Sequence, residues 1–291
     1  MSNITARLFV YLQYLLPRFG ITAMVYRLTR VRNTAVKNLL IRGFVRLFKV
    51  DTQEADAPVP DGYASFNKFF IRELKADARP IADGTDVLAC PVDGTISEAG
   101  KISHGRLFQA KGHYYTLRDL LATDLNDANH YNNGKFATIY LAPHNYHRVH
   151  APFAGQLTAA RYVPGDLFSV NQATVSHLPG LFARNERLIC HFESDMGPFV
   201  VVFVGAMNVG SISTPWTGEI RPRRKGMIEQ LDLGGSPTKR SVAKGGLLGW
   251  FNMGSTVILL LPRTVTLRDS LHQGRPVRMG EELATFNAKA R

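Results

Sequence analysis

The sequence predicts an α+β protein in which N-terminal amphipathic helices precede a β-rich, barrel-like domain. Apolar residues recur at helical spacing within residues 1–50, and short apolar runs separated by turn residues dominate from about residue 87. Hydrophobic residues make up 45% of the 291-residue chain and charged residues 20%, which is typical of a folded protein rather than a disordered one.

Residues 1–50 combine positive charge with apolar side chains. They hold nine bases and no acid, whereas the 26 bases and 23 acids of residues 51–291 leave that part at only +3. The uncharged stretch from Leu8 to Pro17 is ten residues long, about half of the roughly 20 that a transmembrane helix needs. A cleaved signal peptide is also a poor fit, because Pro17 and Arg18 follow the apolar run where small residues would be expected.

The second half of this region forms one apolar stripe at helical spacing, with its bases mostly off the stripe. The stripe is Val36, Leu39, Leu40, Gly43, Phe44 and Leu47, and the bases are Lys37, Arg42, Arg46 and Lys49. A basic amphipathic helix is typical of a segment that lies in the headgroup layer of an anionic membrane. Nucleic-acid binding and a solvated helix face are the alternatives. We favour residues 1–50 as a membrane-associating region, without nucleic acid as a partner, because the bases are interleaved with bulky apolar side chains.

Residues 51–62 mark a boundary. They carry four acids, no base and two prolines, which indicates a linker or surface turn region before a second domain over residues 63–291. Residues 65–74 follow as a short amphipathic helix, with Ser65 as its N-cap.

The rest of the second domain alternates between predicted strands and short helices. The strands are expected at Val87–Pro91, Ala137–Leu141, Leu188–Phe192, Phe199–Val204 and Val257–Leu261. Helices are expected at Thr116–Thr123, Ser169–Ser176 and Leu178–Arg184. Cys90 and Cys190 cannot form a four-ligand zinc site by themselves, so we expect a reducing compartment, with one disulfide as the alternative.

Four polar segments of this domain are candidates for chemistry. They are Val92-Asp93-Gly94, Tyr146-His147-Arg148-Val149-His150, Phe168-Ser169-Val170-Asn171 and Gly254-Ser255-Thr256. Each also has an ordinary structural interpretation as a turn, a pair of satisfied histidines or a helix cap. The two histidines lack the Glu and the third ligand of common zinc motifs, so no metal is expected.

Taken together, these segments supply a carboxylate, an imidazole and a serine. The acid can orient the imidazole, and the imidazole can take the serine proton. An activated Ser255 would attack an external carbonyl in a hydrolase, or the carbonyl of Gly254 in a self-processing proenzyme. Gly254 has no Cβ and tolerates a strained backbone. An N-to-O shift, loss of the Ser255 α-proton and loss of ammonia would leave a pyruvoyl group on a 37-residue small chain, 255–291, beside a large chain, 1–254.

Several separated segments give the chain its resemblance to a known family. They are Phe69-Phe70-Ile71-Arg72, Arg79-Pro80-Ile81, Pro91-Val92-Asp93-Gly94, Gln109-Ala110-Lys111-Gly112-His113-Tyr114, Tyr146–His150, Pro164–Asn171, Leu181–Arg187 and Gly249–Thr256. Over nearly its whole length the chain resembles the bacterial-type phosphatidylserine decarboxylase proenzymes. It departs from them at Met253, where leucine is usual, and at His144-Asn145, where Arg-Asp is common.

The resemblance implies a pyruvoyl-dependent carboxy-lyase of phospholipid biosynthesis. Such an enzyme converts phosphatidylserine to phosphatidylethanolamine and CO2 through a Schiff base with a pyruvoyl group, which self-cleavage at Gly254–Ser255 produces from Ser255. It further implies that Asp93, His150 and Ser255 perform the self-cleavage and that His147 donates the proton in decarboxylation. Spacing alone does not divide these roles between the two histidines.

Substrate binding and location complete the expectations. We expect Phe168, Ser169 and Asn171 to line the substrate pocket, and the cluster Arg221, Arg223, Arg224 and Lys225 to meet lipid phosphate, with a solvated loop as the alternative. The enzyme would be peripheral, on the cytoplasmic side of the cell membrane, with its two chains associated and a homodimer left open. The rival interpretations are a membrane-bound serine hydrolase, a noncatalytic lipid-binding protein and a pyruvoyl decarboxylase for a soluble amino acid.

Overall fold

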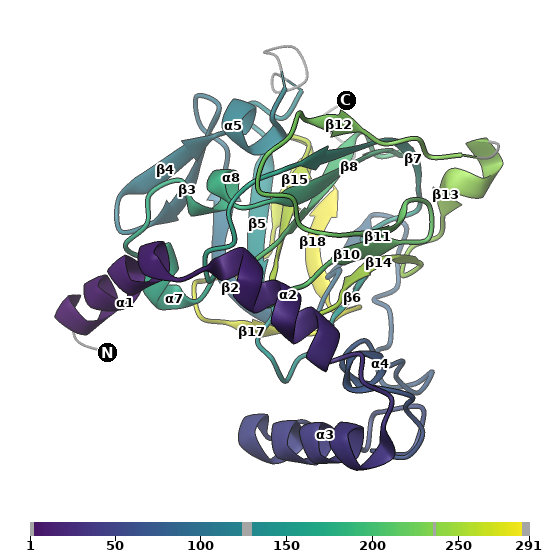
Figure 1. Ribbon diagram of the computed structural model, residues 1–291. Helices are drawn as coiled ribbons and strands as arrows, with labels where there is room; N and C mark the ends of the chain where they lie inside the picture. The colour runs from purple at the N-terminus through teal and green to yellow at the C-terminus, as the bar shows by residue number, and fades with distance from the viewer. Residues whose placement is uncertain (1–2, 124–129, 235–236, 287–291) are drawn as a thin grey trace.

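The computed structural model describes residues 3–123, 130–234 and 237–286. Helices α1 and α2 cross one side of a sheet-rich body, and α3 lies at one end with α4 between it and the strands (Figure 1). The helices are α1 (Asn3–Leu15), α2 (Arg18–Leu28), α3 (Thr34–Phe48), α4 (Phe66–Phe70), α5 (Leu117–Leu121), α7 (Gln172–Val175), α8 (Leu181–Arg184) and the 3-10 helix η1 (Pro237–Arg240).

The strands form a mostly antiparallel body. They are β1 (Val87–Ala89), β2 (Gly94–Lys101), β3 (Arg106–Ala110), β4 (His113–Thr116), β5 (Lys135–Tyr140), β6 (Arg148–His150), β7 (Gly155–Val163), β8 (Arg187–Glu193), β9 (Phe199–Val204), β10 (Ile212–Thr214), β11 (Gly218–Ile220), β12 (Glu229–Gln230), β13 (Ser241–Val242), β14 (Leu247–Phe251), β15 (Thr256–Leu261), β16 (Val265–Leu267), β17 (Pro276–Val277) and β18 (Glu282–Phe286).

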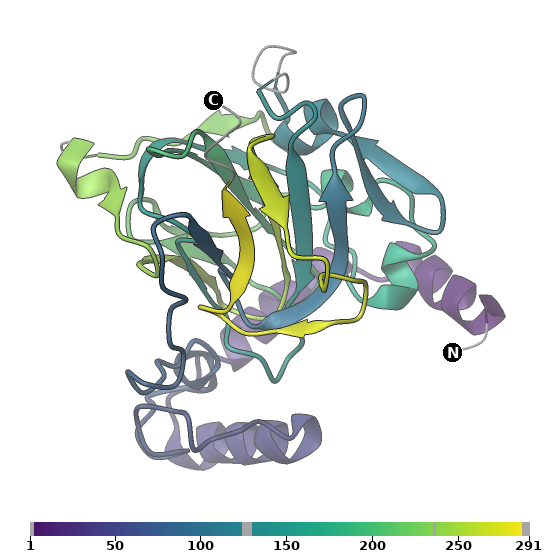
Figure 2. The ribbon, with the colours of Figure 1, turned by 180° about the vertical axis from the view of Figure 1, so that it is seen from behind.

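One large sheet holds the core. Its strand order is β12-β7-β8-β9-β15-β5-β2-β17, with β13 also paired to β7. Strands β9 and β15 are buried along their whole length, which explains their continuous apolar sequences. Smaller sheets with the orders β1-β18-β16 and β11-β10-β14-β6 lie beside it, and the view from behind shows the C-terminal strands next to β1 and β2 (Figure 2).

The prediction of a barrel-like sheet was wrong. Among the described residues the large sheet is open, because β12 and β13 at one end and β17 at the other do not pair with each other. Each of these edge strands is only two residues long, which leaves little backbone to close a cylinder. The five predicted strands and the mixed helix-and-sheet class are confirmed.

The predicted N-terminal helices are present, and each has one face on the body. In α1, Ala6, Val10 and Gln13 are buried, whereas Leu8 is 61% and Leu15 is 83% exposed. In α3, Leu39 and Leu47 are each 73% exposed, and Phe44 packs on the rings of Phe66, Phe69 and Phe70. Six bases of the region lie exposed: Arg7, Arg27, Arg32, Arg42, Arg46 and Lys49.

Three of the nine bases instead bind the body. The Lys37 ammonium is buried and donates to the carbonyl of Pro60 at 3.4 Å, and Arg18 and Arg30 pair with Asp166 and Glu219 at 2.9 and 2.7 Å. Within the described residues, no single helix is long and apolar enough to span a bilayer; α1 from Ile4 together with α2 meets that test only as a pair bent by 83°.

Among the shorter predictions, the helices and the Ser65 cap are confirmed, although the helix expected over residues 65–74 is present only as α4, Phe66–Phe70. The Ser65 hydroxyl accepts a hydrogen bond from the Lys68 N–H at the start of α4, and α5, α7 and α8 lie within the three predicted helical segments. Residues 51–62 form turns that are fastened to the body, since Asp56 N–H donates to the Glu73 carbonyl. Cys90 and Cys190 are both buried free thiols, so the alternative of a disulfide was wrong.

Candidate functional site

Strand register brings the predicted site residues to one end of the large sheet. Thr256 of β15 pairs with Tyr140 of β5, and Tyr140 pairs with Thr95 of β2. Ser255 therefore precedes β15 at the end where Gly94 begins β2 and where the chain leaves β5. The segment leaving β5 carries both histidines, because it continues through His147 to β6.

Ser255 is fully buried, and its hydroxyl is one of several in the described residues that have no hydrogen-bond partner, with that of the adjacent Thr256 among them. The carbonyl of Ser255 accepts a hydrogen bond of 2.8 Å from the Leu141 N–H, but its Oγ has no hydrogen-bond partner. A buried, unpaired hydroxyl costs free energy and is rare in native proteins. This arrangement fits a nucleophile that is held for reaction instead of for stability.

Gly254 is closely surrounded. A Cβ at this position would lie 3.3 Å from the carbonyl oxygen of Leu141 and 3.4 Å from Cε1 of His147. Its φ is not positive, so the structure does not require glycine here for a strained backbone, as the sequence had suggested. The reason for glycine is the close approach of the His147 ring.

His147 is a neutral base beside the Gly254–Ser255 bond. Its Nε2 lies 3.3 Å from the carbonyl oxygen of Pro143, an acceptor only, so Nε2 carries the proton and Nδ1 keeps its lone pair. Nδ1 is buried with no partner, and the ring stacks on Phe70 with centroids 4.0 Å apart. Burial, with the nearby Arg72 charge, lowers the pKa of His147 to about 3, so the ring is uncharged at neutral pH.

His150 differs from His147 in having partners on both ring nitrogens. Nδ1 donates to the carbonyl of Gly245 at 2.8 Å, so Nε2 is the acceptor and receives the Tyr146 hydroxyl at 3.1 Å. Burial raises the pKa of Tyr146 to about 12, which keeps that hydroxyl protonated. Burial also lowers the pKa of His150, so this imidazole too is neutral.

Asp93 is buried at the start of β2, and its carboxylate already has partners. Arg79 binds it through two hydrogen bonds of 2.8 and 2.6 Å, and the Met279 N–H donates to it at 2.9 Å. No direct hydrogen bond joins Asp93, His150 and Ser255 within the described residues. The structure thus brings the three residues to one end of the sheet without linking them in a chain.

A cavity of about 390 Å³ opens at this site. Gly254 and Met253 form part of its wall, Ser169 and Asn171 another, and helices α2 and α3 contribute Val25, Phe44 and Phe48. Phe168 is not in the lining; it is buried, with the Arg18 guanidinium 4.1 Å from its ring centroid. The cavity extends from Gly254 to the helices whose outer faces expose leucine side chains, and Ser255 and His147 lie behind its wall, outside the lining.

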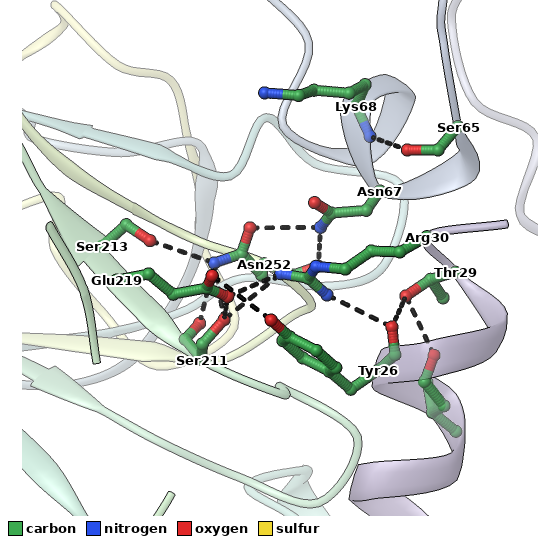
Figure 3. A network of polar contacts seen from close by, with 11 residues as sticks. Tyr26, Thr29, Arg30, Ser65, Asn67, Lys68, Ser211, Ser213, Glu219 and Asn252 are labelled. Carbon is green, nitrogen blue, oxygen red and sulfur yellow. Dashed lines mark hydrogen bonds and ion pairs between the residues drawn. The ribbon is translucent and has the colours of Figure 1, made fainter. Parts of the chain in front are cut away.

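A polar network holds the segment before Gly254, as Figure 3 shows. Asn252 is buried and donates to the hydroxyls of Ser211 and Ser213 at 2.8 and 3.1 Å. Its carbonyl accepts the Asn67 amide at 2.9 Å. Glu219 accepts from Ser211 and, at 2.7 Å, from Arg30 at the end of α2. This network connects α2 to the candidate cleavage segment.

The basic loop after β11 lies partly against α2. The guanidinium of Arg221 stacks 4.5 Å over the ring of Tyr26, and that of Arg223 pairs with Glu229. Arg224 and Lys225 are exposed.

Sequence reasoning did not give roles to Arg79, Tyr146 or Asn252. Arg79 and Tyr146 lie inside segments that carried the family resemblance, and that was the available signal for them. Asn252 also lies in such a segment, Gly249–Thr256, but its contacts could not be predicted from the sequence, because its partners Asn67 and Ser211 are 185 and 41 residues away.

Comparisons with known proteins identify the family of this chain. The family model described as phosphatidylserine decarboxylase matches residues 66–285, and a second, described as PSD, matches residues 8–49. Curated relatives named phosphatidylserine decarboxylase proenzyme are 44% identical in Methylococcus capsulatus over 98% of this chain and 99% of theirs, and 46% identical in Pseudomonas aeruginosa (strain LESB58) over 96% of each chain. The relative from Saccharophagus degradans is 41% identical over 97% of this chain and 99% of its own. The chain therefore belongs to the phosphatidylserine decarboxylase family.

Proposed function

We propose that this protein is a proenzyme that cleaves itself at Gly254–Ser255 and then converts phosphatidylserine to phosphatidylethanolamine and CO2. The observation that carries the proposal is the buried Ser255 Oγ, which has no hydrogen-bond partner. The preceding residue, Gly254, lies against the ring of His147, whose Nδ1 also has no partner. These groups fit the formation of a pyruvoyl group from Ser255.

Self-cleavage needs a base for the Ser255 hydroxyl. We assign that role to His150, with Asp93 as the acid of the set, as the family resemblance suggests. His150 is neutral because burial lowers its pKa, so its Nε2 can accept a proton when the Tyr146 hydroxyl moves away. The Gly254 acyl group then passes from the Ser255 nitrogen to Oγ, and loss of the Ser255 α-proton eliminates Gly254 as a carboxylate. The dehydroalanine that remains rearranges to an imine, and water hydrolyses this imine, so that ammonia leaves and a pyruvoyl group remains.

Decarboxylation would follow in the same cavity. The pyruvoyl carbonyl supplies the electron-accepting group that serine side-chain chemistry lacks. Nδ1 of His147, which has a lone pair and no partner, would take the proton that the substrate ammonium gives up and return it to the carbon that loses CO2. Ser169 and Asn171 line the cavity and would contact the serine headgroup. Phe168 would act indirectly, by packing behind them.

The membrane supplies the substrate in this proposal. The exposed leucines of α1 and α3 would enter the headgroup layer on the cytoplasmic side of the cell membrane, and the exposed bases would bind anionic lipid. Because α2 and α3 also line the cavity, a lipid can reach it without its acyl chains crossing water. Residues 1–50 thus form the membrane region, 51–62 the connection and 63–291 the decarboxylase domain.

The test is release of CO2 from phosphatidylserine in vesicles. The wild-type protein should release CO2 and form phosphatidylethanolamine, and Ser255→Ala should do neither while remaining folded, because its Oγ makes no hydrogen bond to lose. Full decarboxylase activity of the Ser255→Ala variant would refute the assignment, and hydrolysis of ester substrates by an uncut wild-type chain would favour a serine hydrolase.

A further inference from the structure

A second pocket, of about 680 Å³, lies at the other end of α7 from the cavity at Gly254. It is bounded by α1, by the turn between β3 and β4, and by the segment from α7 to α8. Two of these segments, Gln109–Tyr114 and Leu181–Arg187, were distinctive in the sequence and have no part in the proposed reaction.

The lining of this pocket is basic. Arg7, Lys111 and Arg184 carry positive charges, His113 and His177 add two imidazoles, and Tyr11, Tyr14 and Ser176 add hydroxyl groups. Among the described residues no Asp or Glu lines it. Three cations without a lining acid favour an anion with several oxygens, such as a phosphate group. Volumes of this size are typical of small-molecule sites.

Two buried amides fix the walls of the pocket relative to one another. Gln109 of β3 donates to the carbonyls of Val175 and Leu178, each at 2.8 Å, and accepts from the Leu181 N–H at 3.1 Å. Gln13 of α1 donates to the Thr174 hydroxyl at 3.1 Å. The separate segments that carry the three exposed bases are therefore held in place before any anion arrives.

The pocket also lies at the edge of the exposed apolar face of α1. Tyr11 lines it and is 68% exposed, next to Leu8, Leu12 and Leu15, which are exposed as well. If these side chains enter a bilayer, the pocket lies at the depth of the lipid phosphates. Its lining shares no residue with the cavity at Gly254.

We propose that this pocket, separate from the cavity at Gly254, binds the phosphate headgroup of an acidic phospholipid and so fastens α1 to an anionic membrane. The site is independent of the proposed reaction, because its lining contains none of the residues assigned to self-cleavage or decarboxylation.

The test uses the full-length protein and three monomeric probes: short-chain phosphatidylglycerol below its micelle concentration, short-chain phosphatidylcholine and inorganic phosphate. Phosphatidylglycerol should bind saturably and more tightly than either other probe. The double variant Lys111→Asn, Arg184→Gln should bind it at least tenfold more weakly. The matched control Lys101→Gln, Arg263→Gln removes two exposed bases that lie outside both this pocket and residues 1–50, and it should bind phosphatidylglycerol as the wild type does.

Weaker binding by the Lys111, Arg184 variant should not result from a loss of stability. Lys111 has φ +46°, a conformation that asparagine adopts more readily than lysine, so Lys111→Asn should keep or raise the melting temperature. Binding that is unchanged in the Lys111, Arg184 variant would overturn the proposal. Inorganic phosphate binding as tightly as phosphatidylglycerol would overturn the assignment to a lipid.

Discussion

At the scale of single residues, the two neutral imidazoles assigned to the reaction differ in their partners. His147 keeps an unpartnered Nδ1, whereas both nitrogens of His150 are hydrogen-bonded. We predict that His150→Ala remains uncut and that His147→Ala is cut but releases CO2 at least a hundredfold more slowly, consistent with the usual contribution of a proton-transferring group. Gel electrophoresis of the purified variants and a CO2 assay measure the two steps separately. An uncut His147→Ala protein would reverse the assignment of the two histidines.

Substitution of Asp93 tests the self-cleavage mechanism less directly than substitution of either histidine. Removing it would leave the buried Arg79 charge without one of its carboxylates, and breaking a buried ion pair costs about 3–5 kcal/mol. An uncut Asp93→Ala protein would therefore not separate a catalytic role from a structural one.

The low pKa of His147 predicts a pH dependence of stability. The folded protein titrates this ring at about 3, whereas an unfolded chain titrates it near 6.5, so protonation favours unfolding between these values. Its contribution is complete above pH 6.5 and falls as the pH decreases toward 3. In the uncut Ser255→Ala background, lowering the pH from 7 to 4 should cost about 3 kcal/mol more with His147 present than in His147→Gln. Denaturant titrations at the two pH values measure this, and equal losses in both proteins would contradict it.

Local patterns revealed the residue types of the site but not their contacts. Asp93, His147, His150 and Ser255 stand in recognisable segments, and the register of β2, β5 and β15 brings them to one end of the sheet. The Met279 N–H that binds Asp93 is 186 residues away in sequence. Contacts of that range depend on the complete fold, so the sequence could not predict them.

At the scale of elements, the periodicity of apolar residues predicted the strands and helices well. It predicted less well how the sheet edges pair and which faces of the helices are buried. Continuous apolar runs became the buried strands β9 and β15, because burial on both faces removes alternation. Apolar runs do not indicate whether the two edges of a sheet form hydrogen bonds with each other, and the prediction of a barrel-like sheet was wrong for this reason. Lys37 lay off the apolar stripe of α3 yet is buried, because the chain near Pro60 covers that side of the helix.

The network around Asn252 predicts that self-cleavage depends on positioning from α4, β10 and α2. Asn252→Ala should slow cleavage at least tenfold, because the Gly254 segment loses its side-chain anchors on Ser211 and Ser213 and keeps only the backbone contact with Asn67. Glu219→Gln, which keeps a hydrogen bond to Ser211 but weakens the pair with Arg30, should slow it less. Cleavage is followed by gel electrophoresis of freshly synthesised protein.

A matched control separates positioning from loss of stability. Gln109→Ala also removes a buried amide with several hydrogen bonds, at the distant anion pocket. It should lower the melting temperature by a similar amount and leave the cleavage rate unchanged. Equal slowing by Gln109→Ala and Asn252→Ala would mean that Asn252 acts only through stability.

At the scale of the whole molecule, the asymmetric charge and the strand order support one account. The basic N-terminal region lies beside the cavity that contains Gly254, which would place the chemistry next to the membrane in the proposed arrangement. A cut between β14 and β15 would not release the small chain, because β15 pairs with β9 on one side and β5 on the other. The two chains should therefore remain associated until the protein is denatured.

The intact mass of the purified protein under denaturing conditions tests the central claim most directly. The account predicts two chains, residues 1–254 and 255–291, with the smaller one carrying a pyruvoyl group in place of Ser255 and therefore lacking a free terminal amine. Under native conditions the two should have the mass of a complex. A single uncut chain that nevertheless decarboxylates phosphatidylserine, or a cut at any other bond, would contradict the account.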